Sequence, residues 1–164
     1  ADQFIDDYLT GKKPKSLYLY GSFGVGKTYL LGAIANDLAD KGVPTLLVYV
    51  PDFLREIRSG IGDNTLNEKL NFVKKAPILM LDDIAREANT SYIRDQILGP
   101  ILQYRCDNNL PMFVTSNRDF NLLEKHLSET NNVIDTVKGK ALIARFKYLM
   151  KEYELVDKDF RSEI

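Results

Sequence analysis

Short apolar runs and helical stretches alternate along the whole chain. Each apolar run is bounded by glycine, proline or polar residues, which is the pattern of a strand between turns. Strands are therefore predicted at 16–20, 45–50, 77–81, 111–117 and 153–156. The run TLLVYV at 45–50 is apolar without interruption, which is typical of a strand buried on both faces of a sheet.

Between these runs, apolar residues recur three and four positions apart, as they do along one face of a helix. Helices are therefore predicted at 3–9, 28–39, 52–58, 65–75, 91–105, 122–127 and 137–150. Pro100 is expected to kink the fifth of these helices. Asn121 is expected to cap the sixth, with Glu124 completing a capping-box pattern. The polar segment 130–136 lacks periodicity and is the expected mobile loop.

Strands that alternate with helices favour one architecture. The pattern predicts an α/β fold, in which a parallel five-stranded sheet is flanked by helices on both faces. We expect no separate lid domain. Ligands of such folds bind at the carboxyl ends of the strands, so candidate chemistry is sought there.

Composition excludes several classes of protein. The 164 residues suit one domain, and the net charge of −1 excludes a global basic field for nucleic acid. The lone cysteine, Cys106, excludes an internal disulfide and a cysteine zinc cluster, which fits a reducing cytoplasm. No run has the length of a membrane span and the start is not a signal peptide. Because the chain begins with Ala rather than Met, we expect a fragment of a longer protein.

A glycine-rich segment lies between the first predicted strand and the second predicted helix. The segment GSFGVGKT, residues 21–28, matches the phosphate-binding pattern G-x-x-x-x-G-K-[ST], known as Walker A, in its required strand–helix context. Its backbone amides can wrap a phosphate chain, Lys27 can reach the β and γ phosphates, and Thr28 can hold Mg²⁺. The alternative is an ordinary glycine-rich turn with a solvated lysine. The expected ATP- or ADP-binding residues are Gly21, Ser22, Phe23, Gly24, Val25, Gly26, Lys27, Thr28 and Tyr29.

Polar residues follow two of the later strands. The run ILMLDDI carries Asp82 and Asp83 at a strand end, where one aspartate can bind Mg²⁺ and the next can orient an attacking water. Their alternative is a pair of solvated loop acids. The run FVTSN ends in Asn117, whose amide can position water or contact the γ-phosphate. A plain turn asparagine is equally common at a strand end, so the pattern alone leaves both interpretations open.

These motifs, in this order and spacing, resemble those of the AAA+ P-loop ATPases. The phrases LYLYGSFGVGKTYLLGAIAN, VYVPDFLREI, GPILQYR and LPMFVTSN narrow the resemblance to bacterial replicative-helicase loaders of the DnaI/DnaC type. The resemblance implies an ATPase that is Mg²⁺-dependent, slow and stimulated by assembly. It implies delivery of the hexameric DnaB-type helicase onto single-stranded DNA at replication initiation. It also implies that residues 1–164 form the ATPase domain, behind a zinc-binding domain that grips the helicase.

The same resemblance assigns roles to further residues. Asn117 becomes the sensor-1 residue, and the two helices between 52 and 75 become the insertion that faces DNA in initiators and loaders. The basic residues of that insertion are Arg55, Arg58, Lys69, Lys74 and Lys75. Asp52, Glu56, Asp63 and Glu68 lie among them, so ordinary solvated helix charges are the alternative.

Four positions depart from the family pattern. Ala85 and Arg86 stand where glycine and alanine usually follow the paired acids, and Ala141 fills a slot that usually holds an arginine. Many AAA+ proteins also have glutamate where Asp83 stands. Arg145 remains as the expected arginine finger, acting in trans on the ATP of a neighbouring subunit after self-association through the ATP site.

Other functions share part of this pattern. A small-molecule P-loop kinase usually needs an arginine-rich lid, and the chain shows no compact segment of that kind. A nucleotide-bound adaptor without hydrolysis is disfavoured, because the lysine and both acids are present. A transposition-helper ATPase of the same clade is the nearest rival to a helicase loader.

Overall fold

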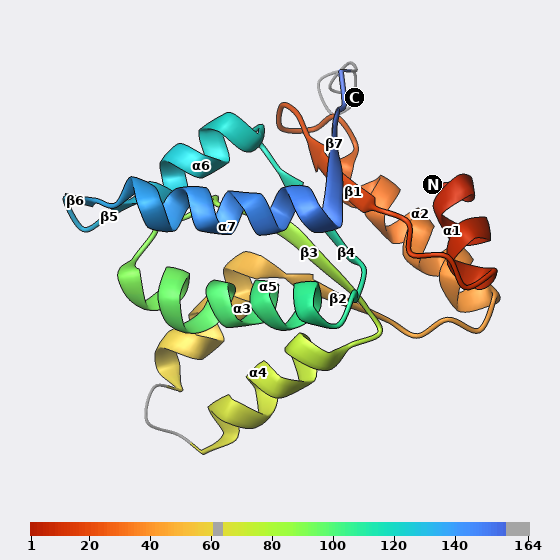
Figure 1. The fold of residues 1–164 in the computed structure, drawn as a ribbon, viewed down its shortest axis with the longest axis horizontal. Helices are drawn as coiled ribbons and strands as arrows, with labels where there is room; N and C mark the ends of the chain where they lie inside the picture. The colour runs from red at the N-terminus through yellow and green to blue at the C-terminus, as the bar shows by residue number, and fades with distance from the viewer. Residues whose placement is uncertain (61–63, 157–164) are drawn as a thin grey trace.

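The computed structural model describes residues 1–60 and 64–156, which form one sheet sandwiched between helices (Figure 1). The five strands of the sheet follow the order β2-β3-β4-β1-β7, and every pair of neighbours is parallel. These strands are β1 (Ser16–Tyr20), β2 (Thr45–Tyr49), β3 (Ile78–Ile84), β4 (Met112–Ser116) and β7 (Met150–Glu154). The predicted fold class is confirmed.

The helices lie where apolar residues recur at helical spacing. They are α1 (Asp2–Leu9), α2 (Lys27–Asp40), α3 (Val50–Ser59), α4 (Thr65–Lys75), the π-helix η1 (Ile93–Leu98), α5 (Gly99–Asp107), α6 (Phe120–Ser128) and α7 (Thr136–Leu149). None of the helices in the described part of the chain is both long and apolar enough to cross a membrane.

The central strand β3 shows how the two layers of helices are held. Successive side chains of a strand point to opposite faces of the sheet. Ile78 and Met80 pack with α1 and α2, whereas Leu79 and Leu81 pack with the larger layer formed by α3 to α7. All four side chains are buried, which is why this strand reads as a continuous apolar run.

The strand β2 differs from its prediction. Its apolar run was expected to be buried on both faces, but β2 lies at the edge of the sheet and pairs only with β3. Leu47 is 48% exposed and Tyr49 is 41% exposed. The prediction was wrong because an apolar run does not reveal whether a second neighbouring strand or a helix layer covers it. Two smaller shifts are that β3 extends to Ile84 and that the last strand begins at Met150.

Three details of the helical layer were also predicted differently. The cap of α6 is Asp119, whose carboxylate accepts a hydrogen bond from the Leu122 amide at 2.8 Å, so the predicted Asn121 cap and its capping box are wrong. The segment expected to be a mobile loop contains a hairpin of β5 (Glu129–Thr130) and β6 (Val133–Ile134). The helix predicted over 91–105 with a kink at Pro100 is instead the π-helix η1 followed by α5, with Pro100 in the first turn of α5.

The strand order brings three strand ends together. β4 lies between β3 and β1, so the segments that follow these three strands meet at one edge of the sheet. The register between β3 and β4 shifts between Leu81 and Ile84, and this irregularity contains the two predicted acids. The fold therefore places the glycine loop, the acid pair and Asn117 at the same edge.

Candidate functional site

The glycine loop connects β1 to α2 and needs its glycines for two reasons. Gly26 begins α2 with a φ of 91°, in the left-handed region that disfavours other residues. At Gly21, a Cβ would lie 2.5 Å from the carbonyl oxygen of Leu155, because the chain after β7 runs close by. The Gly21 amide donates to Ser116 O at 3.3 Å, which ties the start of the loop to the end of β4.

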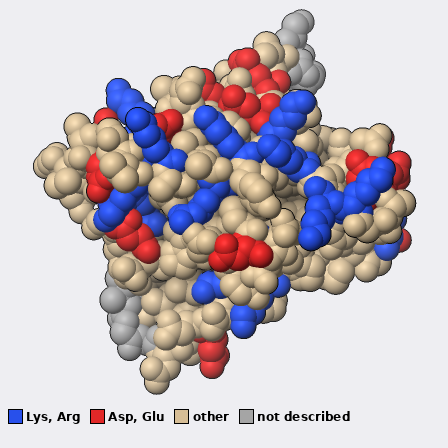
Figure 2. Space-filling model, viewed as in Figure 1, with Lys and Arg blue, Asp and Glu red and all other residues tan. Residues whose placement is uncertain are grey.

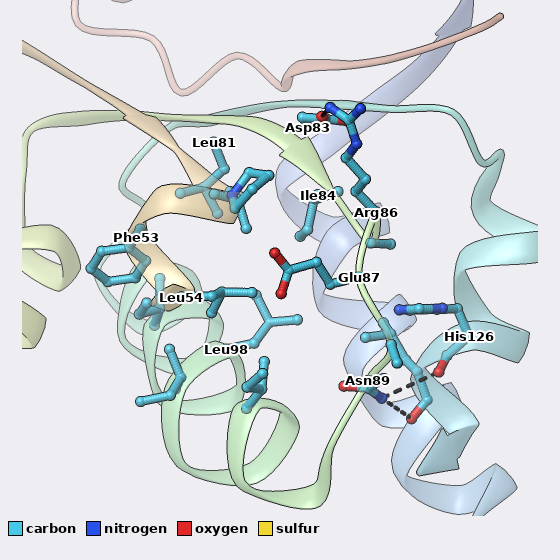
Figure 3. Close-up of a pocket in the computed structure, with 18 residues that line it drawn as sticks. Phe53, Leu54, Leu81, Asp83, Ile84, Arg86, Glu87, Asn89, Leu98 and His126 are labelled. Carbon is cyan, nitrogen blue, oxygen red and sulfur yellow. Dashed lines mark hydrogen bonds and ion pairs between the residues drawn. The ribbon is translucent and has the colours of Figure 1, made fainter. Parts of the chain in front are cut away.

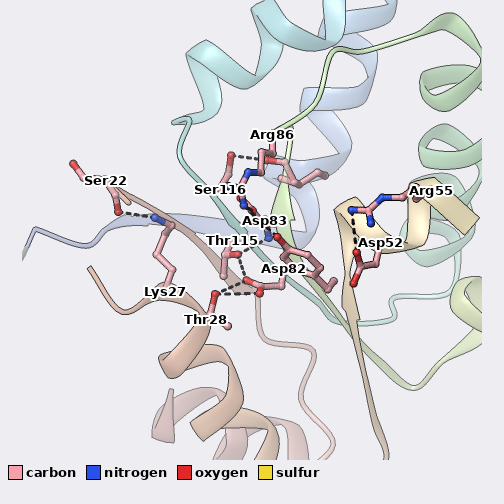
Figure 4. Close-up of polar contacts among 12 residues, drawn as sticks. Ser22, Lys27, Thr28, Asp52, Arg55, Asp82, Asp83, Arg86, Thr115 and Ser116 are labelled. Carbon is pink, nitrogen blue, oxygen red and sulfur yellow. Dashed lines mark hydrogen bonds and ion pairs between the residues drawn. The ribbon is translucent and has the colours of Figure 1, made fainter. Parts of the chain in front are cut away.

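The Lys27 ammonium lies within the loop. It donates to Gly21 O at 2.8 Å and to Ser22 O at 2.7 Å, and Figure 4 shows the contact with Ser22. A cation held over backbone carbonyls at the start of a helix is poised for an anion that approaches the helix N-terminus. The lysine and the helix N-terminus thus act on the same space.

Asp82 is buried and accepts hydrogen bonds from two threonine hydroxyls (Figure 4). Only 4% of the residue is exposed. Thr28 Oγ1 donates to both carboxylate oxygens, at 3.1 and 3.0 Å, and Thr115 Oγ1 donates to Oδ1 at 2.5 Å. The network joins the first turn of α2 to the ends of β3 and β4.

This network has the donor set that Mg²⁺ prefers. A hydroxyl and a carboxylate oxygen lie side by side, and Mg²⁺ binds hard oxygen ligands. Within the described residues, no group of three or more His, Cys, Asp and Glu side chains could hold a metal ion. The Thr28 hydroxyl and the Asp82 carboxylate, 3.0 Å apart, suit an ion that takes its other ligands from water and phosphate oxygens, as Mg²⁺ commonly does.

The Asp83 amide joins this network, but its carboxylate has another partner. Its φ of 64° lies in the left-handed region, and its amide donates to Thr115 Oγ1 at 2.8 Å. Its carboxylate accepts from Arg86 Nη1 at 2.8 Å, and the same nitrogen donates to the Tyr49 hydroxyl at 3.1 Å. The hydrogen bond to Asp83 is the main reason that the pKa of Arg86 is raised. The two adjacent acids thus have different partners.

These groups enclose one cleft of about 360 Å³. Asn117 is exposed and lines the cleft, at the end of β4 and beside the two acids. The cleft is lined by Phe23, Gly24, Gly26, Lys27, Thr28, Tyr29, Tyr49, Asp82, Asp83, Arg86, Thr115 and Asn117. Of the predicted nucleotide-binding residues, Gly21, Ser22 and Val25 are not among its lining.

Comparison with known proteins identifies the family. A family model for the bacterial DnaA ATPase domain matches residues 4–138. The chain belongs to that family. It is 46% identical over 147 residues to the replicative helicase loader DnaI of Bacillus subtilis, which covers 89% of this chain and 47% of that protein. The chain thus spans about half the length of this curated relative.

Solved structures agree with this assignment. A crystal structure of DnaI superimposes with a TM-score of 0.82 at 47% identity and covers 96% of this chain and 79% of that one. A putative primosome component from Streptococcus pyogenes gives a TM-score of 0.73 at 36% identity, over 94% and 74% of the two chains. The resemblance to AAA+ helicase loaders is confirmed, and the domain is one of an ATPase family.

A second, smaller cavity adjoins the cleft of this AAA+ domain (Figure 3). Its volume is about 60 Å³, and most of its walls are apolar side chains from α3, β3, η1 and α5. Asp83 and Arg86 line both the cavity and the cleft. The segment that follows β3 therefore separates a polar compartment from an apolar one.

Arg145 is not brought to the cleft. It lies on α7, in a groove between α7 and the helical segment η1–α5. In the described part of the chain, no residue lines both this groove and the cleft. Lys138 and Ala141 line the same groove. Lys and Arg side chains are spread in a band over the face that α7 crosses, with acidic side chains between them (Figure 2). The structure thus separates Arg145 from the other two predicted catalytic residues.

The basic residues of the α3–α4 insertion are largely paired. Arg55 contacts Asp52 at 3.1 Å, Arg58 contacts Glu87 at 2.7 Å, and Lys69 contacts Glu56 at 3.3 Å. The Lys74 ammonium lies 5.7 Å from the centre of the Tyr104 ring. The acid at position 63 lies outside the described residues. Two of these ion pairs are made within the insertion, and the third reaches the segment after β3.

Sequence reasoning missed three residues of the cleft. Thr115 precedes Asn117 by two positions, so the alternation of side chains along β4 could have identified it. Tyr49 ends β2, and strand ends at this edge are where ligands of such folds bind. Arg86 was noticed only as a departure from the family pattern. Its contact with Asp83 depends on the left-handed turn at Asp83, which no motif predicts.

Proposed function

We propose that this chain is the ATPase domain of a replicative-helicase loader. The identity of 46% with the B. subtilis helicase loader DnaI, spread over 89% of the chain, is the observation that carries this proposal. In this proposal the domain binds and hydrolyses ATP. Its nucleotide state then controls the delivery of a hexameric helicase onto single-stranded DNA at the initiation of replication.

The cleft supports the chemical part of the proposal. The amides of residues 24–28 and the Lys27 ammonium bind the triphosphate, and Phe23 and Tyr29 line the cleft beside them. Gly21 and Ser22 complete the loop through their carbonyls, which accept hydrogen bonds from Lys27. Thr28 and Asp82 hold Mg²⁺, which neutralises phosphate charge when it is bound. Asp83 orients the attacking water, and Asn117 contacts the γ-phosphate or that water.

The position of Arg145 supports the proposal of slow basal turnover. The cleft contains Lys27 and Arg86 as its basic side chains among the described residues, and Arg145 lies in a separate groove. We propose that Arg145 completes the ATP site of a neighbouring subunit, so that assembly on the helicase stimulates hydrolysis. An arginine supplied in this way can raise turnover by about 10³–10⁵.

The partners follow from the same role. The helicase is gripped mainly by a part of the protein outside residues 1–164, and the α3–α4 insertion contacts single-stranded DNA weakly. A loader works on the chromosome, so its proposed location is the cytoplasm.

The test is a loading experiment with the full-length protein. Purified protein, the replicative helicase of the same organism and a circular single-stranded DNA are mixed with ATP, and helicase retained on the circles is measured. We expect helicase capture by the protein in a pull-down, and ATP-dependent transfer to DNA that the Lys27→Ala variant loses. Capture of no helicase would contradict the loader role, and transfer unaffected by Lys27→Ala would contradict the role of the cleft.

A further inference from the structure

Arg86 is the residue of the cleft that the proposed function leaves without a role. Its side chain is about half exposed and contacts three different segments. It donates to the Asp83 carboxylate at 2.8 Å and to the Tyr49 hydroxyl at 3.1 Å, and its guanidinium lies 5.5 Å from the centre of the Phe23 ring. Figure 4 shows the arginine turned back onto Asp83. Arg86 therefore connects the end of β2 and the glycine loop to the acid proposed to orient water.

The turn that carries this ion pair is held in an unusual conformation. Both Asp83 and Ala85 have positive φ values, 64° and 63°, in a region that residues with a Cβ rarely adopt. Ser116 Oγ donates to Ile84 O at 3.1 Å and Arg118 Nε donates to Ala85 O at 3.2 Å. These contacts fix the backbone, so the ion pair sets the direction of the Asp83 carboxylate.

The turn is also anchored at its far end. The side-chain amide of Asn89 donates to His126 O at 3.2 Å and to Leu127 O at 3.3 Å, which fastens the segment to the end of α6 (Figure 3). Glu87 pairs with Arg58 of α3 at 2.7 Å. Because the segment is tied on both sides of Arg86, this arginine cannot leave Asp83 by a movement of the whole loop. Only its side chain can turn away.

We propose that Arg86 is a positioning residue that restrains Asp83 and so slows the hydrolysis of bound ATP. This inference rests on the proposed ATPase function of the cleft. A carboxylate orients water by accepting a hydrogen bond from it, and a guanidinium that donates to the same carboxylate competes for that role. Arg86 thus makes Asp83 a weaker acceptor for the attacking water.

The contact with Phe23 supplies a way to release the restraint. Phe23 belongs to the glycine loop and is more than half exposed, so its packing against Arg86 is not enforced by the core. When the loop wraps a triphosphate, any shift of Phe23 removes one support of the guanidinium. The added phosphate charge offers the guanidinium a second acceptor. Release of Arg86 frees Asp83 for water, and the ATP-bound molecules that keep the ion pair hydrolyse slowly.

The first experiment measures ATP affinity and steady-state turnover of the isolated domain for four proteins. These are the wild type, Arg86→Ala, Asp83→Asn and the double variant. We expect Arg86→Ala to raise kcat about tenfold with little change in KM, because one charge-assisted hydrogen bond to the acid is lost. The double variant should be as inactive as Asp83→Asn, since Arg86 acts through Asp83.

Matched variants separate the restraint from a loss of folding. Arg86→Lys keeps a cation beside Asp83 and should raise kcat less than Arg86→Ala does. Tyr49→Phe removes the second hydrogen-bond partner and should give a small rise of about twofold. Lys41→Ala removes a cation of similar exposure, which pairs with Asp37 at 3.1 Å at the far end of α2, and should leave turnover unchanged. Melting temperatures are recorded for every variant.

The outcomes are distinct. Equal or lower kcat in a folded Arg86→Ala protein overturns the restraint, and so does a gain that persists when Asp83 is replaced. Those results leave the ATPase proposal standing if the wild type binds and hydrolyses ATP. If the wild type binds no ATP, the proposed function itself fails, and the restraint fails with it.

Discussion

Charged residues contributed to the prediction of both the cleft and the α3–α4 insertion, but these side chains are arranged differently in the two regions. In the cleft, charged groups from the glycine loop, the end of β3 and the turn after it converge on one space. On the insertion, Arg55 pairs with Asp52 one turn away and Lys69 of α4 pairs with Glu56 of α3. The charged groups of the first region face the cleft, whereas Arg55 and Lys69 of the insertion pair with acids of the insertion itself.

The difference shows which sequence signals predict position. The glycine loop specifies a backbone path, because Gly26 needs its left-handed φ and Gly21 allows the close approach of Leu155. Two strand ends in a parallel sheet then bring their acids and amide to the same edge. Basic residues along an amphipathic helix specify only a charged face, and exposed ion pairs on such a face contribute about 0–1 kcal/mol each.

The largest expected effect on ATP binding is at Lys27. Lys27→Ala should weaken ATP binding at least about 100-fold, because charge-assisted hydrogen bonds are worth about 1.5–3 kcal/mol each and several are lost at the phosphates. Calorimetry of the isolated domain with ATP and Mg²⁺ measures this. Arg55→Ala, a cation removed from the insertion, is the control and should leave ATP affinity unchanged. Equal affinity in wild type and Lys27→Ala would mean that the nucleotide binds elsewhere.

Replacing Arg145 tests whether a basic residue outside the cleft acts in the cleft of a neighbouring subunit. In the assembled state, Arg145→Ala should bind ATP normally and lose about 10³-fold or more in turnover, because the finger of a neighbouring subunit is missing. Full-length protein on the helicase is the appropriate sample. Mixing Arg145→Ala with Lys27→Ala should restore part of the activity, since one kind of mixed interface has an intact cleft and an intact arginine.

A structural or cis role for Arg145 gives a different result. The two inactive variants would then never complement each other, and Arg145→Ala alone would lose ATP affinity. Lys147→Ala, a basic residue two positions further along α7, is the matched control and should retain turnover.

Much of the fold was predicted because the signals were local and strong. The parallel sheet followed from alternating strands and helices, and the polar edge followed from the strand ends. The edge position of β2 was not predicted, because apolar runs of buried and edge strands look alike when a helix layer covers one face. The choice of Asp119 over Asn121 as a cap also escaped prediction, since either side chain can accept from a helix N-terminus.

The cleft was predicted less completely than the fold. The glycine loop, the acids and Asn117 were found because each sits in a recognisable motif. Arg86 reaches Asp83 across a turn in which Asp83 and Ala85 have left-handed backbone conformations, and Tyr49 lies near Arg86 because β2 pairs with β3 in a register that sets Tyr49 opposite Asp82. Such contacts depend on tertiary position, which the order of residues does not reveal.

Replacing each of the two acids of the cleft should have a different effect on ATP turnover and on its dependence on Mg²⁺. Asp83→Asn should keep ATP affinity and lose about 10²-fold or more in turnover, because the water loses its acceptor. Asp82→Asn should also weaken the dependence of turnover and binding on Mg²⁺, since this carboxylate and the Thr28 hydroxyl form the expected metal ligands. Titrating Mg²⁺ against both variants distinguishes them. Equal turnover in wild type and Asp83→Asn would remove Asp83 from the mechanism and shift the role to another group.

The smallest expected effect is on the insertion, where DNA binding is predicted to be weak. Each phosphate contact to single-stranded DNA adds about 0.7 to the slope of log affinity against log salt. Replacing Arg55 and Arg58 by Gln should therefore lower the slope by up to about 1.4. The ion pairs with Asp52 and Glu87 must be exchanged for phosphate contacts, which keeps the gain in affinity small.

The measurement is fluorescence anisotropy of a labelled oligonucleotide over a range of salt concentrations. Lys12→Gln with Lys13→Gln, an equal change of charge in the segment between α1 and β1, is the control for net charge. If the salt slope falls only when Arg55 and Arg58 are replaced, DNA binds on α3. A slope that falls equally with both pairs reports only the overall charge, and an unaltered slope moves the DNA surface away from α3. The last result would leave the cleft as the site of function and α3–α4 as a solvated face whose charges balance one another.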